Sequence, residues 1–333
     1  MYFFSQTETP AVIIEGIPAG YERYCMKGAQ RFYYEGEHHI TFSQYIECAG
    51  CRIWLHVIKV TEKTRICATT EQSGLRLNFT LGRLNAGAEL NRREAVKLRA
   101  GKIDMFYVPE GTHDAELSEG TYIFFHLDIA APLFLLLQTS REFKSLTKAI
   151  ERTLKAGNGH INSRSVPINL YCATLIEDIR QHSYEGFAAN VYLGKKVWEL
   201  LRYFARHFAH TPAPPEQDRL TTQDVLDTDM LKAHLKQHMH EPFSLEKLCA
   251  TLQLRHPRLQ VRHFKRMYDI SLYAFYSRFR MEEAFNRVTK TGFTISFIAK
   301  ELGYKSAAAF SRAFRLYFGH SPAALRKAKG DRT

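Results

Sequence analysis

The chain has 333 residues, of which 45% are hydrophobic and 24% charged, with six cysteines and a formal net charge of +12. This is the composition of a folded globular protein, and the length suggests two domains of ordinary size. The most apolar run, residues 129–137, is interrupted by Pro132 and is far shorter than the ~20 residues that span a bilayer. The first residues also lack the basic leader and apolar stretch of a signal peptide. We therefore expect a cytoplasmic protein with reduced thiols and no membrane partner.

The excess positive charge lies entirely in the C-terminal third of the chain. Residues 228–333 contain 20 Lys or Arg against 8 Asp or Glu, whereas residues 1–227 contain 26 of each kind. A basic domain attached to a neutral one favours a polyanionic partner for the basic part. A basic surface that serves only solubility explains the charge alone equally well.

Short alternating or β-branched runs mark residues 40–130, which we predict to be rich in β-strands. Clusters of Gly and Asn separate the runs, as is typical of an antiparallel sheet, sandwich or barrel. The clearest runs are residues 53–60, 75–81, 103–108 and 122–127.

Residues 140–210 show helical periodicity. One apolar face comprises Val197, Leu200, Leu201, Phe204 and Phe208. Packing of this face on the sheet is the simpler interpretation, and dimerisation into a homodimer is the alternative.

Prolines mark a domain boundary. Three of them occur within residues 211–218 among polar residues, where they cannot continue a helix. We predict a linker over 211–228 that joins an N-terminal domain of residues 1–210 to a C-terminal domain of residues 229–330.

Cys48 and Cys51 form a lone CxxC motif. A zinc or redox site would need further ligands, and no second CxxC or CxxH completes a set of four. Buried or incidental thiols are the favoured interpretation. We assign no catalytic residue, no metal site and no cofactor to the chain.

Residues 294–326 show the pattern of two short helices around a tight turn. An apolar face runs through Ile295, Ile298, Ala299 and Leu302, and Gly303 follows where the turn needs a left-handed backbone. The next helix has an aromatic inner face and a polar, basic outer face, as a recognition helix in a DNA major groove does. An ordinary helical hairpin with a solvated basic face has the same spacing.

The outer face of this second helix supplies candidate DNA contacts. Arg312 and Arg315 could bind phosphates or guanine edges, and alanines can offer only apolar contact, for instance to a thymine methyl. The candidates are Lys305, Ser306, Ala307, Ala308, Ser311, Arg312 and Arg315.

The pattern also occurs about 50 residues upstream, in a first copy whose candidate DNA contacts are Arg258, Arg262 and Lys265. Residues 294–326 are the second copy. A long helix over 272–288 joins the two copies and would fix the distance between them. Two units in successive major grooves lie ~34–36 Å apart.

These residues resemble the DNA-binding domain of the AraC/XylS family of bacterial transcriptional regulators over about 100 residues. The second copy matches best. The matching segments are SLEKL at 244–248, FK at 264–265, RMEEA at 280–284, TISFIA at 294–299, GY at 303–304, FSRAFR at 310–315, FGHSP at 318–322 and LR at 325–326.

The first copy departs from the family pattern. Gln253 and Asp269 stand where glycines are usual, and residues 254–264 are one residue longer than usual. These departures put the path of the first turn in question, and with it the face that the following helix shows to DNA.

The resemblance implies an α+β protein of two domains: an N-terminal cupin-like antiparallel β sandwich or barrel with helices, and an all-α domain with two helix-turn-helix units. It implies a transcriptional regulator that is not an enzyme. Its expected partners are operator or promoter DNA, RNA polymerase and a small effector held in the N-terminal domain.

An alternative for the N-terminal half is a metal-dependent cupin-type enzyme. LRAG at 98–101 and PEGTH at 109–113 resemble part of a cupin motif. The upstream metal ligands are not evident, although residues 37–39 read Glu-His-His. His113 is more simply a turn or pocket residue than a ligand.

Overall fold

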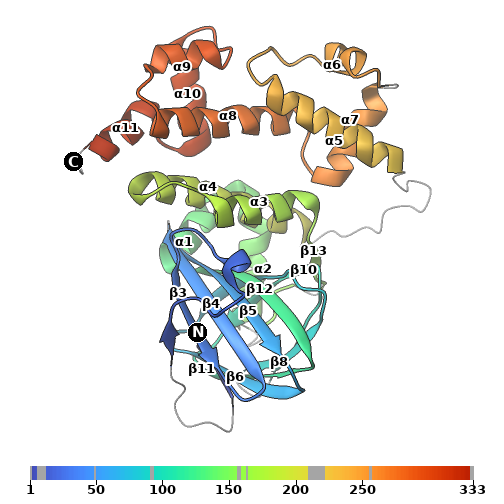
Figure 1. The fold of residues 1–333 in the computed structure, drawn as a ribbon, viewed down its shortest axis with the longest axis vertical. Coiled ribbons are helices and arrows are strands. Elements are labelled where there is room, and N and C mark those ends of the chain that lie inside the picture. The colour runs from blue at the N-terminus through green and yellow to red at the C-terminus, as the bar shows by residue number, and fades with distance from the viewer. Residues whose placement is uncertain are drawn as a thin grey trace. The chain divides into compact units, whose positions relative to one another are not determined.

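The computed structural model describes residues 2–5, 13–48, 50–90, 94–155, 159–162, 164–208, 222–254 and 257–330. The chain forms two compact units (Figure 1). Residues before 212 make up the N-terminal unit, except that segments 169–171 and 184–192 group with the C-terminal unit. The proline-rich stretch 211–218 of the expected linker lies outside the described residues.

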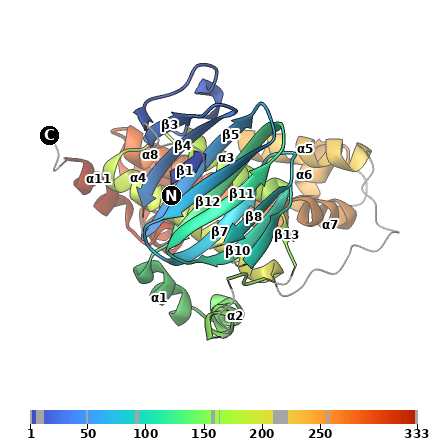
Figure 2. The ribbon, with the colours of Figure 1, turned by 90° about the horizontal axis from the view of Figure 1, so that it is seen from below.

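The N-terminal unit contains two antiparallel sheets (Figures 1 and 2). A small sheet has the strand order β1-β6-β11-β8-β9, and a large sheet has the order β13-β10-β7-β12-β5-β4-β3-β2. The strands are β1 (Tyr2–Ser5), β2 (Ile14–Glu15), β3 (Gln30–Glu35), β4 (His39–Cys48), β5 (Cys51–Val60), β6 (Thr64–Thr70), β7 (Gly74–Thr80), β8 (Ala86–Leu90), β9 (Glu94–Leu98), β10 (Lys102–Val108), β11 (Gly111–Leu117), β12 (Gly120–Ile129) and β13 (Val166–Pro167).

The four predicted apolar runs are β5, β7, β10 and β12, which are neighbours in the middle of the large sheet. Their residues are largely buried because these strands have partners on both edges and packed side chains on their faces. Strands outside the predicted zone of 40–130 were missed. β3, for example, begins at Gln30 and carries polar residues at its exposed positions, so its pattern is weak.

Helices cover the sheets of the N-terminal unit. The first begins at Ala131 rather than near 140, because a proline at the first or second helical position is tolerated there. α1 and α2 lie side by side (Figure 2). The helices are α1 (Ala131–Thr139), α2 (Lys144–Lys155), α3 (Leu170–Gln181) and α4 (Gly186–His207), with single 3-10 turns at Glu22–Tyr24 and Arg141–Phe143.

The apolar face of α4 packs inside its own unit. Val197, Leu200, Leu201 and Phe204 are each at most 2% exposed. This favours the simpler of the two interpretations, and it leaves these four side chains inaccessible to a second copy of the chain.

The C-terminal unit is helical. Its first helix begins at Thr222, so residues 222–228, expected as linker, belong to this helix instead, and residue 229 does not start the domain. Thr228 and Leu231 are fully buried, which explains why the segment folds with the unit. The helices are α5 (Thr222–Gln237), α6 (Leu245–Thr251), α7 (Pro257–Tyr268), α8 (Leu272–Lys290), α9 (Ile295–Glu301), α10 (Ala307–Phe318) and α11 (Pro322–Gly330).

Within the C-terminal unit, α8 lies between two helix pairs, α6 with α7 and α9 with α10 (Figure 1). Phe275, Ala284 and Val288 are buried on α8. Among all described residues, no helix is long and apolar enough to cross a membrane.

Candidate nucleic-acid interface and interior cavity

The second helix pair, α9 and α10, is defined by two caps and two glycines. The hydroxyls of Thr294 and Ser306 each accept a hydrogen bond of 3.1 Å from the N–H three residues later. They satisfy donors that would otherwise be unpaired at the helix starts. Gly303 has a φ of 72° in the turn, and Gly319 has a φ of 77° at the end of α10. The left-handed backbone at both positions explains the predicted need for glycine.

The inner face of α10 is aromatic. Phe310, Phe314 and Phe318 are buried, and successive ring centroids are 5.6 and 4.7 Å apart. Full burial of one such side chain contributes roughly 1.5–3 kcal/mol, so this face fixes the orientation of the helix.

The outer face of α10 carries positive charge. Lys305, Arg312 and Arg315 have no ion-pair partner among the residues that the structure describes. Cations without acidic partners remain available to phosphates. The exposed members of this face are Lys305, Ser306, Ala308, Arg312 and Arg315, and Ala307 and Ser311 are half-buried at its edge.

The first helix pair repeats the second at a constant separation of 50 residues. α6 and α7 each begin and end 50 residues before α9 and α10. Arg262 therefore occupies the position of Arg312, and Lys265 that of Arg315. Both residues are exposed, and so is Arg258 at the start of α7.

The turn of the first pair has the same length as that of the second. Gln253 has a φ of 56° and Asp269 a φ of 58°, so they adopt the backbone of Gly303 and Gly319 without being glycines. A residue with a Cβ in this region costs roughly 1–2 kcal/mol.

The two pairs differ on their inner faces. In α7 the buried positions include Gln260 and His263, where α10 has larger or smaller apolar residues. The Gln260 amide donates a 3.0 Å hydrogen bond to Asp227, and His263 Nδ1 lies 2.8 Å from Asp224 Oδ1. The first pair is therefore anchored through polar contacts to α5, the helix that the sequence analysis placed partly in the linker.

α8 holds both pairs through its own side chains. The Arg280 guanidinium donates to the Leu302 carbonyl in the turn of the second pair. The Tyr276 hydroxyl donates to the Glu241 carbonyl just before the first pair. These contacts tie the turn of the second pair, and the segment just before the first pair, to α8.

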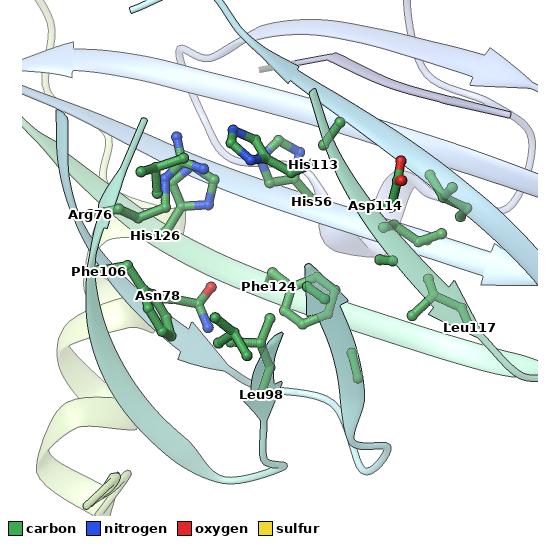
Figure 3. Close-up of a pocket in the computed structure, with 18 residues that line it drawn as sticks. His56, Arg76, Asn78, Leu98, Phe106, His113, Asp114, Leu117, Phe124 and His126 are labelled. Carbon is green, nitrogen blue, oxygen red and sulfur yellow. The ribbon is translucent and has the colours of Figure 1, made fainter. Parts of the chain in front are cut away.

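The N-terminal unit encloses a cavity of about 110 Å³ between its two sheets (Figure 3). Residues of β6, β8, β9 and β11 line it from the small sheet, and residues of β5, β7, β10 and β12 from the large one. Figure 3 shows His56, His126 and Arg76 gathered on one side. Leu98 and Phe124 lie on the opposite side, next to the amide of Asn78.

Burial disfavours the charged form of the histidines that line the cavity. The rings of His56 and His126 stack with their centroids 4.9 Å apart, and the Ser43 hydroxyl lies 2.8 Å from His56 Nδ1. Burial lowers the pKa of both imidazoles well below the usual value. Burial, followed by the charge of Arg76, also lowers the pKa of His113. The polar side therefore offers hydrogen-bonding groups rather than imidazolium charges.

The two charged residues of the lining, Arg76 and Asp114, are both compensated. Arg76 Nε donates to Asp128 Oδ1 at 2.7 Å. Asp114 accepts from Arg65 at 2.8 Å and from the Cys67 thiol at 3.0 Å. The cavity is therefore apolar over most of its wall, with one polar side and little uncompensated charge.

Comparison with known proteins places the C-terminal unit in a family. A helix-turn-helix domain family matches residues 248–328, from within α6 to within α11. The raffinose operon transcriptional regulatory protein RafR of Pediococcus pentosaceus is 25% identical over 141 residues, 42% of this chain and 49% of that protein. The chain belongs to the AraC/XylS family of regulators. It spans about half the length of this curated relative.

Solved structures similar to this AraC/XylS-family chain include the C-terminal domain of AraT, a response regulator from Geobacillus stearothermophilus. That domain is 26% identical, with a TM-score of 0.30, and covers 33% of this chain and 88% of its own. ToxT from Vibrio cholerae is 11% identical, with a TM-score of 0.26, and covers 84% of this chain and 98% of its own.

In this AraC/XylS-family chain the predicted DNA contacts gather on two helix faces. Arg258, Arg262 and Lys265 lie on α7, and the other candidates lie on α10 or just before it. Their role in DNA contact stays a prediction. Arg76 and His126 of the cavity were not predicted from the sequence, although both lie within predicted strands. Polar residues inside otherwise apolar strands were the available signal.

The structure also shows where three other features of the sequence lie: His113, Glu37 and the CxxC motif. His113 lines the cavity, as expected of a pocket residue. Glu37 is exposed in the β3–β4 hairpin. Cys48 and Cys51 face each other across the β4–β5 hairpin as buried free thiols, and burial raises the pKa of Cys48 to about 12. A thiol with such a pKa stays protonated and unreactive.

Proposed function

We propose that the chain is a sequence-specific DNA-binding regulator of transcription, controlled by a small molecule bound in the cavity of the N-terminal sandwich. The observation that carries the proposal is the repeat of two helix pairs, with basic side chains at matching exposed positions of α7 and α10.

Both helix pairs act as helix-turn-helix units in this proposal. α7 and α10 each enter a major groove, where Arg262 and Arg312 contact bases or phosphates. The matched positions of these arginines support the use of both units. Lys265 and Arg315, one helical turn further on, add contacts that release counterions and make binding depend on salt.

The test is selection of bound duplexes from a random DNA pool with the full chain. We expect an enriched motif with two half-sites about one helical turn apart, and affinity for it that falls steeply as salt is raised. Binding that is indifferent to salt, or that shows no preference over random DNA, would overturn the proposal. A motif with a single half-site would limit DNA reading to one unit.

In this proposal the N-terminal sandwich is a cupin-like domain that binds the effector. Its cavity suits a small molecule with an apolar body and one hydrogen-bonding end. The body would contact residues such as Leu98 and Phe124, while the polar end faces His56, His126 and Arg76. A polyol needs hydrogen-bonding partners on several sides, which the aliphatic part of the wall does not supply.

Filling the cavity tests the effector site. Ala68→Leu adds side-chain volume to the cavity wall, and Ala95→Leu makes the same change at an exposed position of β9. A compound panel is screened for ligands that raise the melting temperature of the wild-type chain. A cavity ligand should lose that effect in Ala68→Leu and keep it in Ala95→Leu. Equal stabilisation of both variants would place the ligand elsewhere.

RNA polymerase is the onward partner that a transcriptional regulator requires. A homodimer would need a surface other than the predicted face of α4, because that face is largely buried in its own unit. The alternative of a metal-dependent cupin-type enzyme gains no support from the cavity. Among the described residues, no His or Asp side chain that lines the cavity belongs to a cluster of three residues with converging ligand atoms.

A further inference from the structure

Histidines cluster at the turn that connects α5 to α6. His238 directly follows the end of α5, and His240 and Glu241 lie in the turn. One ligand atom from each of these three residues lies within 4.8 Å of the other two. The ring of His234, one helical turn earlier, stacks on His238 with centroids 4.1 Å apart. Imidazole nitrogens with a carboxylate oxygen are a donor set that zinc prefers in proteins.

The cluster is accessible and partly enclosed. His234, His238 and Glu241 border a recess of about 160 Å³. The side chains of His238 and Glu241 are 40% and 35% exposed, so an ion can enter from solvent. We infer that His238, His240 and Glu241 bind a divalent transition-metal ion, with zinc as the best match and a water in the fourth position.

The carboxylate of Glu241 already attracts positive charge. It accepts hydrogen bonds from Lys247 Nζ at 2.8 Å and from His238 Nδ1 at 2.9 Å. Lys247 has a side chain that is 70% exposed and can move into solvent. A divalent ion on Glu241 therefore replaces the Lys247 ammonium, because both cations would compete for the same oxygens.

The turn that carries these ligands contacts both helix pairs. Lys247 is the third residue of α6, so loss of its ion pair alters the first pair directly. The Glu241 carbonyl accepts the hydrogen bond from Tyr276 of α8. The His240 carbonyl packs so closely against Gly303 that a Cβ there would collide with it. A metal ion at this turn is thus placed to change the orientation of α7 relative to α10, the two helices proposed to face DNA.

The experiment titrates zinc into the full chain without a histidine tag, after chelator treatment and in the absence of DNA. We expect one equivalent of zinc to bind to the chain and to raise the melting temperature of the C-terminal unit. Two variants, His238→Ala/His240→Ala and the isosteric Glu241→Gln, should bind zinc at least about tenfold more weakly. His38→Ala is the control, because His38 lies near Glu37 and Glu62 on the surface and outside the cluster.

Failure to bind zinc, or equal zinc affinity in the wild type and both variants, would overturn the site. Far-UV circular dichroism of the metal-free variants shows whether they fold. The coupling to DNA rests on the proposed function and is measured separately, as the change in affinity for the selected DNA when zinc is added. A change in the wild type that the double variant lacks supports the coupling, and an unchanged wild-type affinity would overturn it. Because zinc binding is measured without DNA, failure of the site and failure of DNA recognition remain distinguishable.

Discussion

The two helix pairs of the C-terminal unit have helices of equal length, offset by 50 residues, but they differ in the side chains that pack on their inner faces. The second pair packs on Phe310, Phe314 and Phe318, which form a continuous aromatic face. The first pair places the amide of Gln260 against Asp227 of α5. The first pair also buries Phe264 and Tyr268, whose ring centroids are 4.7 Å apart. Matching basic outer faces are therefore positioned by aromatic packing in both pairs, with polar anchoring to α5 added in the first.

The turns of the two pairs also differ, in backbone strain and in close contacts. Gly303 and Gln253 adopt nearly the same left-handed backbone, with φ values of 72° and 56°. The glycine also permits a close contact with the His240 carbonyl. The first turn thus carries conformational strain that the second avoids, and the second carries a steric requirement of its own.

The largest effect is expected from Gly303→Ala. The new Cβ would meet both an unfavourable φ and the His240 carbonyl, so we expect the C-terminal unit to lose about 2–4 kcal/mol of stability. Circular dichroism follows its unfolding, while fluorescence of Trp54 and Trp198 reports the N-terminal unit. The control is Gly292→Ala, where a Cβ meets nothing within 4 Å. Equal melting of both variants would show that the close contact is absent in solution.

The DNA affinities of two single-arginine variants compare the outer face of α7 with that of α10 directly. Arg312→Ala and Arg262→Ala should each weaken binding to the selected DNA by about 1–3 kcal/mol if the arginine contacts a base. Arg99→Ala, at an exposed position of the N-terminal unit, controls for the loss of one charge. If Arg262→Ala binds like the control, the first pair does not read DNA despite its matching position.

The polar anchor is tested by Asp227→Ala. This change removes the acceptor of the buried Gln260 amide and should destabilise the C-terminal unit by about 1–2 kcal/mol. The exposed Asp229→Ala on the same helix provides the matched control. Unchanged melting of Asp227→Ala would mean that the first pair is held by its apolar contacts alone.

The smallest expected effect is a gain in stability. Gln253→Gly relieves the left-handed strain, offset in part by the greater freedom of glycine in the unfolded chain, and should stabilise the unit by up to about 1 kcal/mol. Denaturant unfolding of the full chain, followed by circular dichroism, measures the shift. A loss of stability would show that the Gln253 side chain contributes more than its backbone strain costs.

Local patterns in the sequence predicted much of this protein. The four apolar runs that became β5, β7, β10 and β12 were recognisable because strands with both faces buried are hydrophobic over most of their length. The capped helices α9 and α10 were recognisable because Ser306 and Gly303 mark their ends with residues that suit few other conformations.

Other features depended on contacts between distant residues. Residues 222–228 looked like the continuation of a proline-rich linker, yet Asp224 and Asp227 fold into α5 because α7 supplies their partners. The cavity joins Arg76 and His126 from two strands 50 residues apart, and no local spacing brings them together.

The sequence by itself determined the family and the basic C-terminal region with its candidate DNA contacts, because helix periodicity and capping act within a few residues. Only the tertiary structure decided the extent of α5, the matching positions of Arg262 and Arg312 and the side chains that meet in the cavity and at His238. Those features arise from packing between elements, whose free energy depends on which surfaces meet rather than on any one segment.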